Sequence, residues 1–93
     1  MPSVADLVDE PRLRELVDDN AELQRGRALA DGGAVRFGNF GPLAVTAEVD
    51  DGYTHGVELA STPQGLRWFC SCNADGFCVH ATAAAIETWR RSP

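Results

Sequence analysis

The sequence predicts an α+β fold in which an N-terminal helical segment is followed by a three- or four-stranded antiparallel meander and a C-terminal helix. Three observations lead to this prediction. Apolar residues recur every third or fourth position over residues 3–30, which is typical of helices. They alternate with polar residues in the middle of the chain, which is typical of strands, and an alanine-rich run over residues 79–91 has high helix propensity.

With 93 residues, the chain has room for one compact core, so we predict a single domain over residues 1–93. Within it we expect a helical segment (1–32), strands (33–69) and a cysteine-rich clasp leading into the last helix (70–91). A domain of this size has a small margin of stability, and a metal or another cross-link would add to it.

Residues 1–32 begin with a helix-start signal, since Ser3 and Asp6 have the spacing of a capping box. Pro11 suits the first turn of a new helix. The apolar stripe beyond it predicts one amphipathic helix that ends at Gly32-Gly33, because glycine tolerates the left-handed conformation that often follows a helix. The stripe consists of Leu13, Leu16, Val17, Leu23 and Ala30.

The segment 33–69 is expected to form strands joined by tight turns. Aromatic and β-branched residues favour strands over residues 34–40 and 66–70, and two runs between them alternate in polarity. Each alternating run predicts one buried face, made of Leu43, Val45, Ala47 and Val49 in the first run and of Tyr53, His55, Val57 and Leu59 in the second. Turn formers separate the strands at Gly41-Pro42, at Asp50-Asp51-Gly52 and over residues 61–65.

The strongest functional signal is the group Cys70, Cys72, Cys78 and His80. Three thiolates and one imidazole are one of the donor sets that bind structural zinc in a tetrahedral site. Cys70 and Cys72 share one side of an extended strand, and the turn formers of residues 73–76 bring the other pair back. At the entrance of the last helix, free N–H groups and the helix dipole favour the thiolate of Cys78. We therefore predict one structural Zn²⁺ in a clasp that joins the last strand to the helix.

Three alternatives to zinc remain at this point. The three thiols could form a labile disulfide, although a Cys-x-Cys bridge closes a strained ring and leaves His80 without a role. Iron–sulfur ligation is commoner with four cysteines or paired histidines. Cys78 could act as a nucleophile with His80 as its base, but the sequence offers no third orienting residue or oxyanion site, so the chain is not predicted to be an enzyme.

The pattern Cys-x-Cys, a loop, Cys-x-His and a helix of small residues resembles the SWIM-type zinc finger, and the chain is similar to a small stand-alone bacterial member. The resemblance implies that Cys70, Cys72, Cys78 and His80 bind zinc in a β-β-α arrangement and that the domain takes part in protein or DNA interaction. Less specific similarity extends over roughly residues 25–90. The chain departs from the family in its short loop between the cysteine pairs, and in Val79, where a basic residue is often found.

The net charge of −6, from 14 acids against 8 bases, argues against a surface that binds a polyanion throughout. A protein partner is therefore the first functional expectation. The alternative is binding of nucleic acid through Arg67, Arg90 and Arg91, with Arg36 and exposed aromatic residues in support. The sequence shows no signal peptide and no apolar run long enough to span a membrane, which predicts a cytoplasmic protein that does not bind membranes.

The remaining histidine and the tryptophans each receive a structural interpretation. His55 is expected to be a satisfied or half-exposed residue of a strand face rather than a fifth ligand. Trp68 has the parity of the first two cysteines and is expected to flank the metal and exclude water. Trp89 is expected to pack into the core, beside an arginine pair that complements the end of the last helix.

Overall fold

The computed structural model describes residues 2–17, 19–72 and 76–92, and it has the predicted α+β architecture. Three helices come first, four strands follow, and a longer helix comes last. In chain order the elements are α1 (Val4–Leu7), α2 (Glu10–Leu16), α3 (Asn20–Asp31), β1 (Val35–Phe40), β2 (Ala44–Asp50), β3 (Thr54–Thr62), β4 (Gly65–Cys70) and α4 (Val79–Arg91).

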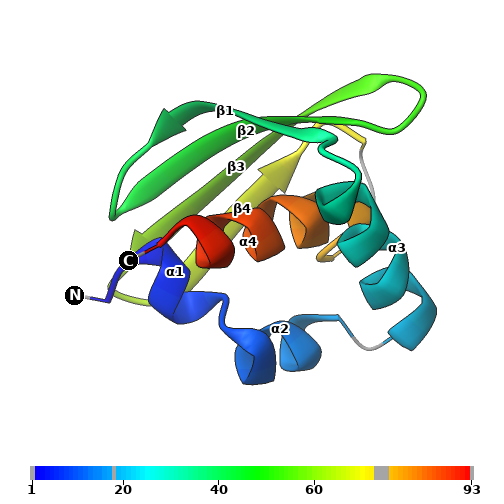
Figure 1. Ribbon diagram of the computed structural model, residues 1–93. Coiled ribbons are helices and arrows are strands. Elements are labelled where there is room, and N and C mark those ends of the chain that lie inside the picture. The colour runs from blue at the N-terminus through cyan, green and yellow to red at the C-terminus, as the bar shows by residue number, and fades with distance from the viewer. Residues whose placement is uncertain (1, 18, 73–75, 93) are drawn as a thin grey trace.

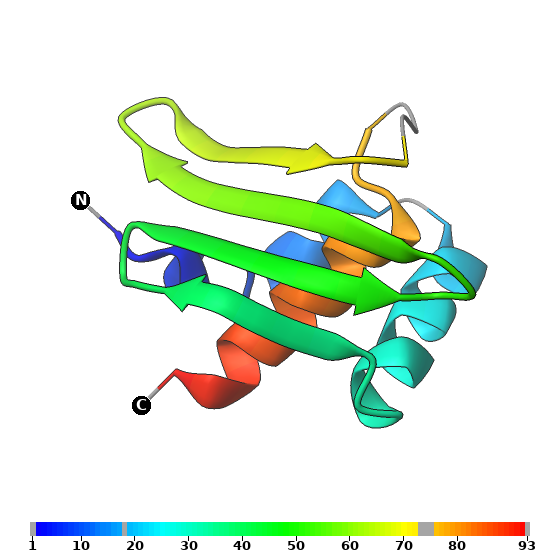
Figure 2. The same ribbon diagram turned by 90° about the horizontal axis from the view of Figure 1, so that it is seen from above.

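The four strands form one antiparallel sheet in the order β1-β2-β3-β4, so every strand pairs with its neighbour in the sequence. Figure 1 shows the helices on one side of this sheet, with α4 beneath the strands. Figure 2 looks onto the opposite face, which carries no helix. The sheet is therefore covered on one side only, and β1 and β4 form its two edges.

The N-terminal helices begin where the sequence predicts, but they are shorter. Ser3 and Asp6 form the expected capping box, and Pro11 lies in the first turn of α2. The single helix predicted beyond Pro11 is wrong, because α2 ends at Leu16 and α3 begins at Asn20. A new N-cap explains the break, since the carboxylate of Asp19 accepts a hydrogen bond of 2.9 Å from the N–H of Ala21.

The acidic N-terminal segment is docked on the rest of the molecule. The N–H of Val4 donates to the carbonyl of Pro42 over 2.7 Å, and the hydroxyl of Ser61 donates to the carbonyl of Pro2 over 2.6 Å. Val4 and Val8 are buried in the core. These contacts tie the first helix to the turn before β2 and to the end of β3, which lie far from it in the sequence.

The buried faces of the two central strands agree with the alternation in the sequence, except at their first positions. Val45, Ala47 and Val49 of β2 are buried, as are Val57 and Leu59 of β3. Leu43 and Tyr53, however, are 47% and 80% exposed. Both precede their strands, so they belong to the turns and the pleat does not direct them to the core.

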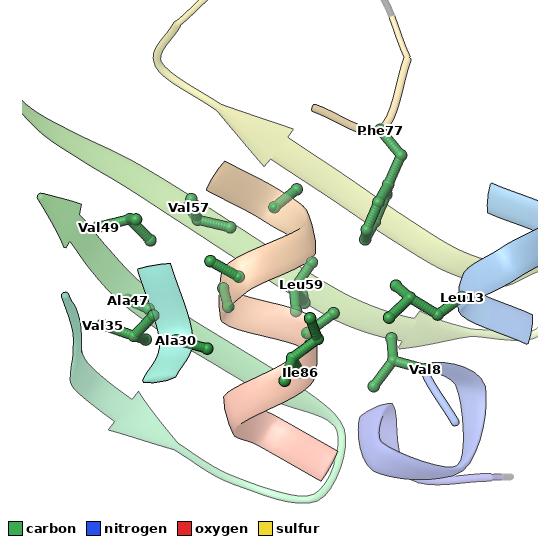
Figure 3. Packing of buried hydrophobic residues seen from close by; sticks show 14 of the residues in the cluster. Val8, Leu13, Ala30, Val35, Ala47, Val49, Val57, Leu59, Phe77 and Ile86 are labelled. Atoms are coloured by element: carbon green, nitrogen blue, oxygen red, sulfur yellow. The ribbon is translucent and has the colours of Figure 1, made fainter. Parts of the chain in front are cut away.

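Helix α4 supplies the centre of the core. Four of its nine buried residues are alanines, and small side chains let the helix approach the sheet closely. Figure 3 shows the resulting cluster, in which Leu59, Phe77 and Ile86 lie together. Helix α3 packs against α4 at Gly26, where an added Cβ atom would lie 2.6 Å from Cγ2 of Thr82.

The core position predicted for Trp89 is wrong, because its side chain is 51% exposed. The buried positions of α4 are filled by smaller residues, among them Ala81, Ala85 and Thr88. Trp89 instead lines a shallow groove beside Val8 and Ile86. The indole is therefore half-covered by the N-terminal helices rather than packed under the sheet.

Candidate metal centre

The four predicted ligands lie together in the structure. One donor atom from each of Cys70, Cys72, Cys78 and His80 lies within 4.8 Å of all the others. The first pair comes from the end of β4 and the turn after it, and the second pair comes from the start of α4. The group can therefore hold one metal ion. The turn predicted over residues 73–76 falls largely on residues 73–75, which lie outside the described residues.

The first arm of the site is fixed to the neighbouring strand. Strand β4 ends at Cys70, so Cys72 lies in a turn and not, as predicted, on the same strand face. Ser71 holds this turn in place through a reciprocal pair of hydrogen bonds with Gly56 of β3. The N–H of Ser71 donates to the carbonyl of Gly56, the N–H of Gly56 donates to Oγ of Ser71, and both distances are 3.0 Å.

The second arm is the first turn of α4. Cys78 is the N-cap residue, and its sulfur accepts the N–H of Ala81 over 3.4 Å. Nδ1 of His80 lies 3.7 Å from Sγ of Cys70 and 4.0 Å from Sγ of Cys78. Tetrahedral bonds of about 2.0–2.3 Å would place such donors about 3.5–3.8 Å apart, so the spacing is close to that of a single bound ion.

Burial opposes ionisation of these thiols, contrary to the expectation that the helix start favours the thiolate of Cys78. Desolvation is the largest cause and raises the pKa of Cys70 to about 12. It also raises the pKa of Cys78, although the N–H of Ala81 acts in the opposite direction. The thiols of Cys72 and Cys78 raise the pKa of Cys70 further, whereas for Cys78 the thiol of Cys72 raises the pKa and that of Cys70 lowers it. The thiolates therefore need a cation, and a metal ion that binds here must displace their protons.

Two residues that the sequence does not connect with the site surround His80. Oδ2 of Asp51, in the turn between β2 and β3, lies 3.1 Å from Nε2 of His80. The ring of His55 stacks on the ring of His80, with 3.9 Å between centroids and 21° between planes. His55 is half-buried and is not one of the four clustered donors. No sequence pattern points to Asp51, since an acid in an Asp-Asp-Gly turn is explained by the turn itself.

Aromatic residues lie close to the candidate ligands in the sequence, on β4 and just before α4. Phe77 is buried and contacts Trp68 edge-to-face, with 5.2 Å between ring centroids. Trp68 nevertheless remains 39% exposed, and Phe69 next to it is 61% exposed. Phe77 thus links the clasp to the core, while Trp68 and Phe69 present aromatic surface on the edge strand β4.

Comparison of the chain with protein-family models, with curated proteins and with solved structures finds no match. The resemblance to SWIM-type fingers therefore stays a prediction that depends on the four ligands and their spacing. None of the helices among the described residues has the length and apolar character needed to cross a membrane.

The three arginines considered as partner contacts do not lie together. Arg67 lies on β4, at one edge of the sheet. Arg90 is 2.7 Å from Asp31 and 3.4 Å from Glu87, and the Asp31 contact is the main cause that raises its pKa. The guanidinium of Arg91 is 3.6 Å from Glu87, and it lies 4.9 Å above the ring of Phe37 on β1, the opposite edge.

Proposed function

We propose that the protein is a non-catalytic module in which one structural zinc ion holds the end of the sheet to the last helix, and that the module binds a protein partner. The convergence of Cys70, Cys72, Cys78 and His80 carries this proposal. The SWIM-type resemblance in the same four residues agrees with it.

The chemistry of the donors favours zinc over other ions. Calcium and magnesium prefer oxygen ligands, whereas three thiolates and an imidazole suit a softer tetrahedral ion. A multi-iron cluster would hold its ligands further apart, because several atoms lie between them. Donor atoms within 4.8 Å of one another instead fit a single ion. None of the three cysteines forms a disulfide, which leaves all three as candidate ligands.

A structural role follows from the number of donors. Four protein ligands fill a tetrahedral zinc ion and leave no open position for water or substrate. The ion would also join the turn after β4, which holds Cys72, to the start of α4, which Cys78 caps. Structural zinc in small peptides contributes on the order of 10 kcal/mol to folding, which is large beside the core of a small domain.

The charges favour a protein partner over nucleic acid. The chain carries a net charge of −6, and Arg90 and Arg91 are paired with acids of their own and the neighbouring helix. Arg67 is separated from them by the width of the sheet. Phosphate binding needs positive charge that is concentrated and unpaired. The exposed aromatic side chains of Trp68 and Phe69 are the kind that protein interfaces bury.

Native mass spectrometry of the reduced protein, compared with its denatured mass, tests the zinc. We expect a native excess of about 63 Da, the mass of one Zn²⁺ less the protons it displaces. The Cys78→Ser variant should lose this excess, while Ser92→Ala, at the other end of α4, should keep it. A wild-type protein that binds no metal, with all thiols open to titration, would refute the proposed centre.

Affinity capture with quantitative mass spectrometry tests the partner. A specific partner should be retained by the zinc-loaded wild type, lost with Phe69→Ser and retained with Trp89→Ser, which removes a similarly exposed aromatic side chain elsewhere. A protein retained equally by all three baits does not bind through the exposed ring of Phe69. If every retained protein behaves this way, the assignment of Phe69 to the interface is wrong.

A further inference from the structure

Asp51 lies far in sequence from the clasp, yet it contacts the metal-binding histidine directly. It belongs to the turn between β2 and β3, and its Oδ2 is 3.1 Å from Nε2 of His80. A carboxylate can only accept hydrogen bonds, so the hydrogen in this contact must be on Nε2. A neutral imidazole carries one N–H, and therefore Nδ1 of His80 keeps its lone pair.

The nitrogen with the lone pair is also the one that faces the sulfur atoms. Nδ1 lies 3.7 Å from Sγ of Cys70 and 4.0 Å from Sγ of Cys78. The opposite tautomer would aim an N–H at the place where the ion binds and leave Asp51 facing a second acceptor. The contact with Asp51 thus selects the tautomer that can ligate.

We propose that Asp51 is a positioning residue of the metal centre, which fixes Nδ1 of His80 as the ligand atom by accepting the Nε2–H. This inference rests on the proposed zinc site. It adds to the Cys-x-Cys and Cys-x-His pairs a fifth functional residue that does not touch the ion. It also gives the β2–β3 turn a role in binding.

The surroundings hold both partners of this hydrogen bond in place. The side chain of His80 is 8% exposed, and the ring of His55 stacks on it. On the other side, Arg25 of α3 lies 3.8 Å from the same Oδ2 atom of Asp51. The arginine is exposed, so this ion pair adds little stability, but it limits the directions that the carboxylate can take.

Charge gives the contact a second effect. A carboxylate that accepts the far N–H of a metal-bound imidazole makes that imidazole a stronger donor to the metal. Three thiolates and Zn²⁺ leave the centre with a charge of about −1, and Asp51 adds another negative charge. Arg25 places a positive charge beside Asp51 and so partly offsets this second charge. Loss of such an outer contact typically weakens metal affinity about 10–100-fold.

The nitrogen signals of the histidine rings provide the first test and need no variant. In a long-range ¹H–¹⁵N spectrum of the zinc-loaded wild type, we expect His80 to show a metal-bound Nδ1 and a protonated Nε2. The Nε2–H should exchange slowly with water because Asp51 accepts it. A metal-bound Nε2 on His80 would overturn the proposal even if zinc is bound, and it would leave the metal centre itself intact.

Zinc affinity, measured by competition with a chromophoric chelator, provides the second test. Asp51→Ala should weaken binding about 10–100-fold and speed the exchange of the Nε2–H. Asp51→Asn keeps an accepting oxygen, so its zinc affinity should lie between those of the wild type and of Asp51→Ala. Asp50→Ala removes an equal charge from the adjacent, exposed position and should match the wild type.

The outcomes separate the two proposals. If the wild type binds zinc and Asp51→Ala changes neither the affinity nor the Nε2–H signal, the role of Asp51 is refuted and the zinc site stands. If the wild type binds no zinc, the site is refuted, and this role of Asp51 with it. Should Asp51→Ala fail to fold, the wild-type spectrum and the Asp51→Asn affinity still decide.

Discussion

Gly26 of α3 and Thr82 of α4 contact each other so closely that no side chain fits between them. A Cβ atom added to Gly26 would lie 2.6 Å from Cγ2 and 2.8 Å from Cβ of Thr82, and 3.2 Å from the carbonyl oxygen of Val79. Two of these atoms belong to a buried β-branched side chain and the third to the backbone, so none of them can move aside easily. Thr82 lies one turn after Cys78, whose carbonyl accepts a hydrogen bond from the Thr82 hydroxyl, so we expect a change in helix packing here to affect the metal centre.

Gly26→Ala should therefore destabilise the protein, although alanine has the higher helix propensity. We expect a loss of about 1–3 kcal/mol in the free energy of unfolding, measured by urea denaturation, together with weaker zinc binding. Gly56→Ala is the control, because a Cβ there meets nothing within 4 Å. A stabilised Gly26→Ala variant would show that α3 and α4 are further apart than described.

Cys72→Ser should abolish zinc binding and lower the melting temperature by about 15 °C or more. This corresponds to roughly 3 kcal/mol at about 5 °C per kcal/mol for a domain of this size. Ser71→Ala is the neighbouring control: it removes one hydrogen bond to Gly56, so it should cost about 1 kcal/mol and keep its zinc. A Cys72→Ser protein with an unchanged melting curve would contradict a structural role for the ion.

The pH dependence of stability should differ between the metal-free and the zinc-loaded protein. The folded state raises the pKa of Cys70 to about 12, so the metal-free fold favours the neutral thiol. The resulting stability is complete below about pH 8.5, the usual thiol pKa, and is lost as the pH rises from there toward 12. Unfolding of the reduced, chelator-treated protein by urea at about pH 8 and pH 10 measures this loss.

Zinc reverses the direction of this pH dependence, because the ion binds thiolates and releases their protons. We expect binding at about pH 7 to release about three protons, one from each cysteine, and affinity to fall as the pH falls. Titration calorimetry in two buffers of different ionisation enthalpy counts these protons. Release of one proton or none would mean that the thiols do not ligate as proposed.

Nucleic-acid binding should be weak or absent. We expect labelled single- and double-stranded DNA to bind with a Kd above about 10⁻⁴ M at physiological salt, since non-specific DNA binding proteins usually fall at 10⁻⁴–10⁻⁶ M. Fluorescence anisotropy at several salt concentrations measures this. Tighter, salt-dependent binding that weakens in both Arg67→Ala and Arg90→Ala would instead support the DNA alternative over the protein partner.

The sequence predicts this fold well where local signals decide the structure. The capping box at Ser3, the end of α3 at Gly32-Gly33 and the start of α4 at Val79 are all confirmed, because each depends on neighbouring residues only. The break before α3 is not predicted, because the apolar spacing resumes at Leu23 after an interruption at Asn20, which one helix can accommodate. There the local cap by Asp19 takes precedence over periodicity.

The clustering of the four donors is confirmed for a related reason, since residues 70–80 form a short clasp whose two arms are close in sequence. Contacts between distant segments leave no such pattern. The pairing of Asp51 with His80 spans two strands and a loop, and either residue has a sufficient local explanation. The exposure of Trp89 likewise depends on how closely α4, with its alanines, approaches the sheet.

The position of α4 has a consequence for the synthesis of the protein. Residues 79–91 are the last of the eight elements to leave the ribosome, yet they supply the surface on which the sheet and the helices pack. The earlier strands can pair as local hairpins, but the helix that covers most of the sheet is missing until residues 79–91 have left the ribosome. Cys78 and His80 emerge at the same stage. The nascent chain should therefore stay accessible to proteases until α4 has emerged, and it should acquire metal only then.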